Sequence, residues 1–284
     1  MKFLAGCSLL LLAGSAHAAG GLRRELAADD DAAPEWTYRT TGTAGEEPLS
    51  PSDWHLGYPD CAGTRQSPIN IAVPSITAVN VSPFSLSFSS ATCAGNEMSF
   101  KGDGAVWQVG FEGCTTQPSL TYEGQVYNLL QFHIHSPSEY EIGGAEYSAG
   151  FHFVHVKAGT TSDLLVVGVA FDITTHSTNP ELQKYWDVLE TGDSTTTDTF
   201  TASPYDLLPL NPGFTHFMGS LTTPPCTEGV EWIFMNNPNY MSETQLNLYR
   251  TSVATFPGSK VSELGNTNRP IQPVNDRALT YVVL

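Results

Sequence analysis

Short apolar runs separated by turn residues make up most of the chain. Residues 85–88 alternate polar and apolar side chains, which is the period-two pattern of a half-buried strand. Other short runs of β-forming residues are bounded by Gly, Pro, Asn or Ser, so they also predict strands. These runs are 106–111, 131–135, 151–156, 164–171 and 230–235.

Two segments carry helix signals. Asn179 followed by Pro180 is typical of an N-cap and a first-turn proline. Ser242 and Gln245 have the spacing of a capping box. The apolar stripes that follow these starts are Leu182, Trp186 and Leu189, and then Leu246, Tyr249 and Val253. Strands outnumber helices, so the pattern predicts a mainly β protein built on a large mixed sheet with peripheral helices.

The first 18 residues have the form of an export signal. Lys2 precedes an apolar run over 3–13, and residues 16–18 (AHA) have the small-x-small pattern of a cleavage site. Residues 19–35 are polar and acidic, which predicts a solvated leader or linker. No break in composition follows, so we expect one domain over 36–284. No apolar stretch is long enough for a transmembrane segment.

The composition is that of an acidic globular protein. The 284 residues include 12 Lys+Arg and 29 Asp+Glu, for a formal net charge of −17, and 40% of them are hydrophobic. This apolar fraction supports a sizeable core and argues against disorder over most of the chain. The negative charge argues against a nucleic-acid partner, because it would repel phosphates.

Cysteine usage fits export. Cys7 leaves with the signal, and the four that remain are Cys61, Cys93, Cys114 and Cys226. An even number in an exported chain predicts two disulfides, with three possible pairings. We therefore expect the protein in the secretory pathway and finally outside the cell, on its surface or in the lumen of an organelle. Asn80 is a glycosylation candidate, and an unused sequon is an equal expectation.

Four of the eight histidines fall within 23 residues of one another. Side chains on a strand alternate between faces, so Gln131, His133 and His135 share one face. On the next strand, His152 and His155 lie on opposite faces. A hairpin that places His133 and His135 beside His152 gathers three neutral imidazoles, the donor set of a catalytic zinc site with an open fourth position. His155 is then a structural histidine.

A second kind of metal site uses some of the same residues. His133, His135 and Glu139 match the first metal motif of cupins, in which the glutamate itself binds iron or manganese. The usual second cupin motif, a Pro-x-Gly turn ahead of another histidine, is missing around His152. The zinc interpretation is therefore favoured.

Five motifs, in order along the chain, resemble those of the α-type carbonic anhydrases. They are 66–71 (QSPINI), 131–139 (QFHIHSPSE), 151–155 (FHFVH), 219–230 (GSLTTPPCTEGV) and 268–273 (NRPIQP). The resemblance spans nearly the whole predicted domain. It implies a single domain around a twisted, mixed and mostly antiparallel sheet. It also implies an enzyme in which zinc-bound hydroxide hydrates carbon dioxide reversibly to bicarbonate and a proton.

The resemblance also assigns roles to individual residues. It implies zinc ligation by His133, His135 and His152. Thr222 is then expected to orient the zinc-bound hydroxide and to donate its own proton to Glu139. The remaining expected roles are bicarbonate binding by Thr223 and an apolar wall for carbon dioxide made by Val154, Val166, Leu221, Val230 and Trp232. Gln131 shares the strand face of His133 and is expected from that position to be its hydrogen-bond partner, with an exposed strand amide as the alternative. Cys61–Cys226 matches the disulfide of exported members, which leaves Cys93–Cys114 as the second bridge.

Three positions depart from the family pattern. Ala105 stands where fast members carry a proton-shuttling histidine, so proton export is expected to depend on buffer. Gly150 replaces a glutamate that usually receives the N–H of the third zinc ligand, which predicts weaker zinc binding unless a water or Glu146 substitutes. Tyr140 stands where a histidine often follows the glutamate, and no role is predicted for it.

The alternative function is a binding or adhesion module that keeps the fold without the activity. Silent relatives usually lose a ligand histidine, whereas His133, His135 and His152 are all present. The enzyme is therefore the favoured hypothesis.

Overall fold

The computed structural model describes residues 33–40, 43, 45–72, 86–89, 96–100, 105–111, 114, 116–173, 177–189, 195–198, 202–210, 213–256 and 258–282. The predicted signal, most of the acidic leader, Cys93 and Asn80 lie outside the described residues. Pro34–Leu284 forms one compact unit by its internal contacts.

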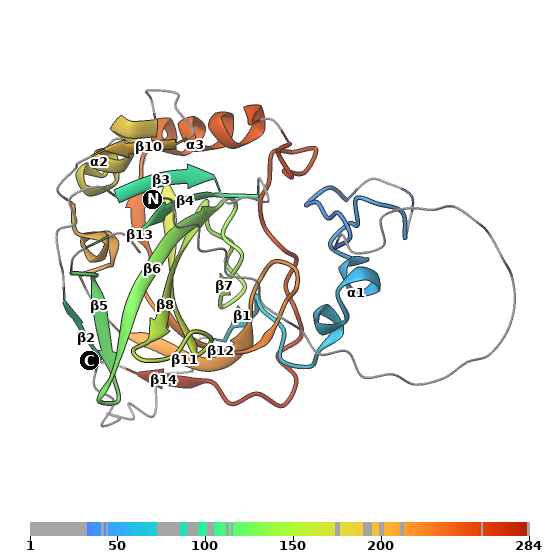
Figure 1. Cartoon of the computed structure of the whole chain (residues 1–284), viewed down its shortest axis with the longest axis horizontal. Coiled ribbons are helices and arrows are strands. Elements are labelled where there is room, and N and C mark those ends of the chain that lie inside the picture. Colours follow the sequence, from blue (N-terminus) through green and yellow to red (C-terminus); the bar gives the residue numbers. More distant parts are fainter. Residues whose placement is uncertain are drawn as a thin grey trace, which may run out of the picture. The chain divides into compact units, whose positions relative to one another are not determined.

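A single large sheet organises this unit (Figure 1). In the described part of the chain it has 12 strands. Nine of them follow in the spatial order β10 (Thr195–Asp198), β3 (Asn96–Phe100), β4 (Trp107–Gly110), β6 (Gln125–His135), β8 (Ala149–Lys157), β9 (Leu164–Ile173), β12 (Glu228–Met235), β11 (Phe214–Ser220) and β14 (Thr280–Val282). β5 (Ser119–Tyr122) pairs with β6 and with β2 (Leu86–Ser89), and β13 (Asn239–Met241) pairs with β9.

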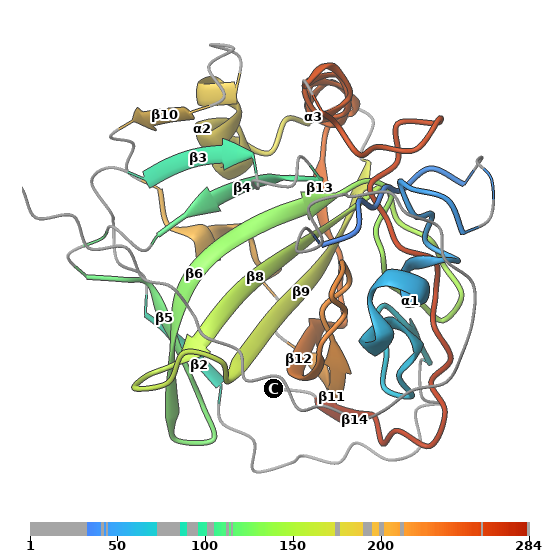
Figure 2. The same cartoon turned by 45° about the vertical axis from the view of Figure 1, so that its right-hand side comes forward.

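Antiparallel pairing dominates this sheet, as the resemblance implies. Parallel pairs occur where β9 meets β12 and β13. A separate parallel pair is formed by β1 (Asn70–Ile71) and β7 (Glu141–Ile142). The predicted mainly β class and the mixed, mostly antiparallel sheet are confirmed. Each of the six predicted strands overlaps an observed one, and the central strands β6, β8 and β9 run side by side in Figure 2.

Helices are few among the described residues. They are α1 (Trp54–Gly57), α2 (Pro180–Leu189), α3 (Glu243–Thr255) and the 3-10 helices Pro59–Ala62 and Pro204–Leu207. Both predicted helix starts are confirmed. Asn179 Oδ1 accepts the backbone N–H groups of Glu181 and Leu182, and Ser242 and Gln245 form the capping box. None of the described helices has the length and apolar character needed to cross a membrane.

The central strands separate two different layers. Phe132, Ile134, Phe151 and Phe153 pack in one large apolar core together with side chains of α2 and α3. Phe132 and Ile134 thus lie on the face opposite Gln131, His133 and His135, as strand alternation requires. The opposite face carries a smaller apolar cluster around Trp232 and also the three candidate zinc ligands. Because strand side chains alternate, one strand pair supplies both the core and the site.

Candidate metal centre

The register of β6 and β8 brings the three predicted ligands together. His133 lies directly opposite His152 in this antiparallel pair, and His135 lies opposite Gly150. The three histidines are buried, and their ligand atoms all lie within 4.8 Å of one another. The ring centroids are 5.0 Å apart for His133–His135, 5.2 Å for His133–His152 and 4.8 Å for His135–His152.

The two ligands from β6 each direct Nδ1 at an oxygen. His133 Nδ1 lies 2.8 Å from Gln131 Oε1, which is the contact that their shared strand face predicts. His135 Nδ1 lies 2.5 Å from the backbone carbonyl oxygen of Thr267. A carbonyl oxygen only accepts, so Nδ1 carries the proton in the neutral ring and Nε2 keeps the lone pair for a metal. Such outer contacts orient metal ligands.

The ligand from β8 lies among aromatic rings. His152 is steeply inclined to Trp232, with ring centroids 4.9 Å apart at 81°, and to Tyr140, at 5.8 Å and 77°. Tyr140 is fully buried and packs on Trp232 and Phe234. Burial holds the pKa of Tyr140 well above its ordinary value, so the phenol stays neutral.

Gly150 fits closely against Ser138 beside this ligand. A Cβ atom at Gly150 would lie 2.9 Å from Ser138 Oγ and 3.3 Å from Ser138 Cα. Ser138 Oγ itself donates to the carbonyl oxygen of Tyr140. A side chain at position 150 therefore requires Ser138 to shift. Glu146, a carboxylate considered as a substitute partner for His152, is exposed.

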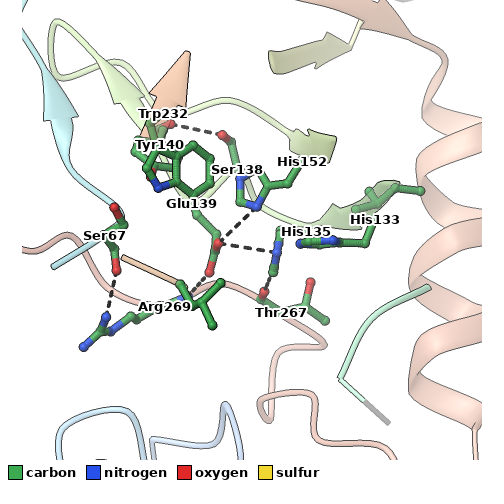
Figure 3. A network of polar contacts seen from close by, with 12 residues as sticks. Ser67, His133, His135, Ser138, Glu139, Tyr140, His152, Trp232, Thr267 and Arg269 are labelled. Atoms are coloured by element: carbon green, nitrogen blue, oxygen red, sulfur yellow. Dashed lines mark hydrogen bonds and ion pairs between the residues drawn. The ribbon is translucent and has the colours of Figure 1, made fainter. Parts of the chain in front are cut away.

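Glu139 lies at the centre of the polar network in Figure 3. Its Oε2 atom is 3.4 Å from His135 Nε2 and 3.8 Å from His152 Nδ1. Its Oε1 atom accepts the backbone N–H of Arg269 at 2.8 Å. The carboxylate is buried, so this N–H fixes its position on the ligand face of the sheet.

Arg269 ties the segment 61–67 to this carboxylate. Its guanidinium donates to Gln66 Oε1, to the carbonyl oxygen of Ser67 and to that of Cys61. It also lies 5.5 Å from the ring centre of Trp54. Burial lowers the pKa of Arg269 from 12.5 to about 10, so the side chain remains charged at neutral pH.

The loop between β11 and β12 carries the two candidate threonines. Thr222 and Thr223 are both buried. Leu221 N–H donates to the carbonyl oxygen of Thr227, and Cys226 N–H donates to that of Thr223. The expected Cys61–Cys226 disulfide is present and anchors the loop to the segment that precedes residue 66. Cys114 is also disulfide-bonded, but Cys93 lies outside the described residues, so the second pairing stays a prediction.

The five residues of the expected apolar wall belong to one cluster. Val166, Val230 and Trp232 are among its buried members, and Val154 and Leu221 are partly buried against them. Trp232 links this cluster to the ligands, because its ring contacts His152 and its Nε1 donates to the carbonyl oxygen of Ser220. The apolar cluster and the three imidazoles are therefore neighbours.

Two residues with expected roles, His155 and Ala105, lie outside this cluster. His155 is buried on the opposite face, where Nδ1 meets the carbonyl oxygen of Phe153 and Nε2 meets the hydroxyl of Tyr205. This is the structural role that we expected. Ala105, at the position of the family's shuttle histidine, is fully buried with Val106 against Trp36 and Cys226.

Thr267 and Arg269 belong to the site, although no sequence pattern predicted a role for them. Both act through backbone groups, the Thr267 carbonyl on His135 and the Arg269 N–H on Glu139. A backbone donor or acceptor leaves no mark on residue identity. The only available signal was their position within or beside the 268–273 motif.

The donor set of the three histidines fits zinc. Three neutral imidazoles at one buried point are the protein ligands of open, catalytic zinc sites. In the described residues, the group of candidate ligand atoms consists of these three histidines, and Glu139 is not a member of it. This contradicts the cupin alternative, in which Glu139 itself binds the metal.

Comparison with known proteins gives the same picture. The model of the eukaryotic-type carbonic anhydrase family matches residues 49–283. A carbonic anhydrase of Pectobacterium atrosepticum is 31% identical over 253 residues, which cover 87% of this chain and 90% of that protein. The α-carbonic anhydrase of Thermovibrio ammonificans, solved with sulfanilamide, superposes with a TM-score of 0.69 at 30% identity, covering 87% of this chain and 98% of that one.

The chain therefore belongs to the eukaryotic-type, or α-type, carbonic anhydrase family. It is a carbonic anhydrase by homology, and its three-histidine cluster is the donor set for the family's zinc. The reaction of the family is the hydration of carbon dioxide.

Proposed function

We propose that the protein catalyses the reversible hydration of carbon dioxide with zinc held by His133, His135 and His152. The register of β6 and β8 is the observation that carries this proposal, because it places three buried imidazoles within 4.8 Å of one another. When bound by three histidines, zinc lowers the pKa of a water at its open position to about 7 and so supplies hydroxide at neutral pH.

Glu139 and Thr222 form the proposed orienting pair. The Arg269 N–H holds Glu139 Oε1, and an ionised carboxylate can only accept hydrogen bonds. The Thr222 hydroxyl therefore donates its proton to Glu139 and keeps only lone pairs to offer. It then accepts a hydrogen bond from the nucleophile and turns the nucleophile's own lone pair toward the substrate.

The apolar cluster beside the ligands is the proposed site for carbon dioxide. This substrate has no charge, so it is best held by an apolar surface from which water is excluded. Val154, Val166, Leu221, Val230 and Trp232 provide that surface. Thr223, buried next to Thr222, is the proposed partner of bicarbonate.

We also propose that the protein works after export. The Cys61–Cys226 disulfide supports this, because disulfides persist in oxidising compartments and are rare in the cytosol. The exterior of the cell, its surface and the lumen of an organelle all meet this condition.

The direct test measures zinc content and the rate of carbon dioxide hydration on the same purified samples. We expect about one zinc per chain and a measurable rate in the wild type. Thr222→Ala should lower kcat/KM by about 100-fold at unchanged zinc content, because orientation is lost. The matched variant Thr222→Ser keeps the hydroxyl and should retain most of the activity. A zinc-loaded wild type with no hydration above background would instead support the silent binding module.

The same assay tests the consequence of Ala105. An alanine cannot carry a proton, so at low buffer strength an external base must remove it. Adding imidazole should raise kcat by about tenfold and leave kcat/KM almost unchanged. A rate that does not respond to imidazole would contradict the predicted buffer dependence.

A further inference from the structure

A cavity outside the zinc site borders β11 and β14. It has a volume of about 710 Å³, which is within the size range of small-molecule pockets. None of its lining residues is a zinc ligand, an orienting residue or a member of the proposed carbon dioxide wall. β14 lies at the edge of the sheet, next to β11, as Figure 2 shows.

Two arginines line this cavity, Arg65 and Arg277. The whole chain has 12 basic residues against 29 acidic ones, so an arginine has many possible carboxylate partners. Nevertheless, within the described residues neither guanidinium lies within ion-pair distance of a carboxylate. Two arginines without a carboxylate partner in one cavity are typical of a site for an anion.

Backbone carbonyl groups fix the orientation of the Arg277 guanidinium. Its Nε donates to the carbonyl oxygen of Val274 at 2.9 Å, its Nη2 to that of Pro273 at 2.6 Å and its Nη1 to that of Met218 at 3.5 Å. A guanidinium has five N–H donors, so two remain for a ligand after these three contacts. The carbonyls fix the plane of the group, which reduces the entropy lost on binding.

Arg65 is brought to the same cavity by contacts of its neighbours and its own backbone. Asn275 Nδ2 donates to the carbonyl oxygen of Thr64 at 2.8 Å, which joins the two segments that carry the arginines. The Arg65 N–H donates to Glu228 Oε1 at 2.7 Å, while the Arg65 side chain is exposed. Both arginines line the same cavity, and the charge of Arg65 contributes, after burial as the largest cause, to the lowered pKa of Arg277.

The remaining groups around the cavity limit which anion fits. Asp276 also lines it, and the negative charge of Glu228 acts on Arg277. These two carboxylates offset much of the charge of the two guanidinium groups, which favours a monovalent anion over a dianion. Met218 and Ala278 add apolar surface, and the volume far exceeds that of a bicarbonate ion.

We propose that the cavity between Arg65 and Arg277 binds a monovalent organic carboxylate whose apolar body lies against Met218 and Ala278. Its carboxylate bridges the two guanidinium groups, which relieves their repulsion. This site is separate from the zinc centre and does not depend on the proposed reaction.

The experiment uses 4-fluorobenzoate as the probe and follows its 19F NMR signal during titration of the zinc-loaded protein. Arg65→Gln removes one guanidinium from the cavity and should weaken binding about tenfold or more. Arg39→Gln is the matched control, because Arg39 is also exposed, lies outside this cavity and carries the same charge. It should leave the affinity unchanged. Equal Tm values for both variants and the wild type verify that the fold is intact.

Three further titrations distinguish binding in this cavity from binding at the zinc centre and from nonspecific apolar contact. Binding should persist after zinc is removed, since the metal centre is not involved, and the neutral analogue 4-fluorobenzamide should not bind. Bicarbonate should displace the probe only weakly. The proposal is wrong if Arg65→Gln and Arg39→Gln bind the probe equally, or if zinc removal abolishes binding. Displacement by bicarbonate at equal affinity would overturn the assignment to an organic carboxylate.

Discussion

His133 and His135 on β6 each direct Nδ1 at an oxygen, whereas His152 on β8 packs against the rings of Tyr140 and Trp232. The two strands are direct neighbours, and His133 even pairs with His152 in register. Nevertheless, hydrogen bonds orient the ligands from β6, and packing surrounds the ligand from β8.

The difference follows from what each strand offers two residues before its ligand. On β6, Gln131 shares the ligand face and supplies an oxygen. On β8, Gly150 shares the face of His152 and has no side chain, and Ser138 approaches into that space. Tyr140 then contributes a large ring beside His152. A metal ligand can thus be held by a hydrogen bond or by close packing, and the two supports respond to different mutations.

Removing the ring of Tyr140 should have the largest effect. Tyr140→Ala leaves a cavity in a fully buried cluster, so we expect a loss of about 3–5 kcal/mol in the free energy of unfolding. His152 also loses one of the aromatic rings that pack against it, so zinc should dissociate faster. Tyr140→Phe keeps the ring and removes only the buried hydroxyl, so the free energy of unfolding should change by about 1 kcal/mol or less.

Chemical denaturation and zinc competition with a chelator measure both quantities. The packing interpretation predicts that Tyr140→Phe keeps the wild-type zinc affinity. If Tyr140→Ala were to keep it as well, aromatic packing would not be what orients His152.

Removing the oxygen of Gln131 tests the other kind of support. Gln131→Ala should weaken zinc binding by about 10–100-fold, the usual consequence of losing an outer partner of a metal ligand. Gln131→Glu keeps an acceptor for the His133 N–H and serves as the control. Competition with a chelator measures the zinc affinity of both variants. Equal affinities would contradict the interpretation that the oxygen of residue 131 orients His133. Tm should change little in either variant, because Gln131 lies outside the large apolar core.

Only some of these supporting contacts could be predicted from the sequence. Strand alternation was enough to place His133, His135 and Gln131 on one face and His155 on the other, because that rule is local. The pairing of β6 with β8 then gave the third ligand. The contacts of Thr267 and Arg269 could not be predicted, since they use backbone atoms from a segment about 130 residues away. Nor did the pattern reveal that Tyr140 packs on His152, because a tyrosine in a strand-rich chain fits many positions.

Adding a methyl group at Gly150 should have a moderate effect. The new Cβ in Gly150→Ala meets Ser138 Oγ at 2.9 Å, so overpacking should destabilise the fold by about 1–3 kcal/mol. In a Ser138→Ala background the nearest obstacle is gone, and the same change should be milder. A double-mutant cycle measures this coupling. Additive losses would show that Ser138 is not what excludes a side chain at position 150.

The contact between position 150 and Ser138 also affects the test of the weaker zinc binding that Gly150 predicts. Gly150→Glu alone would combine a new acceptor near His152 with a steric conflict at Ser138. In the Ser138→Ala background, Gly150→Glu should tighten zinc binding by about tenfold, which is the gain expected from an outer partner. Unchanged affinity in that background would contradict the predicted weakness.

The smallest effect concerns the opposite face of β8. His155 donates from Nδ1 to the carbonyl oxygen of Phe153 and accepts the hydroxyl of Tyr205 at Nε2, so the folded protein needs its neutral form. Burial lowers the pKa of His155 from 6.5 to about 3. Between these two pH values the unfolded chain binds a proton that the folded chain does not. The free energy of unfolding should therefore fall as pH falls through this window, by about 1.4 kcal/mol per pH unit from this residue.

His155→Gln keeps a neutral polar side chain and removes this titration, so its stability should vary less steeply with pH between 6.5 and 3. Urea denaturation at a series of pH values measures the free energy of unfolding of the variant and the wild type. The contributions of all other titrating groups cancel in the difference between the two. His55→Gln is the control, because His55 is exposed and removing it leaves the buried His155–Tyr205 pair intact. Parallel pH curves for wild type and His155→Gln would mean that the buried imidazole does not stay neutral. His155→Gln should not release zinc, because His155 lies on the face of β8 opposite His152.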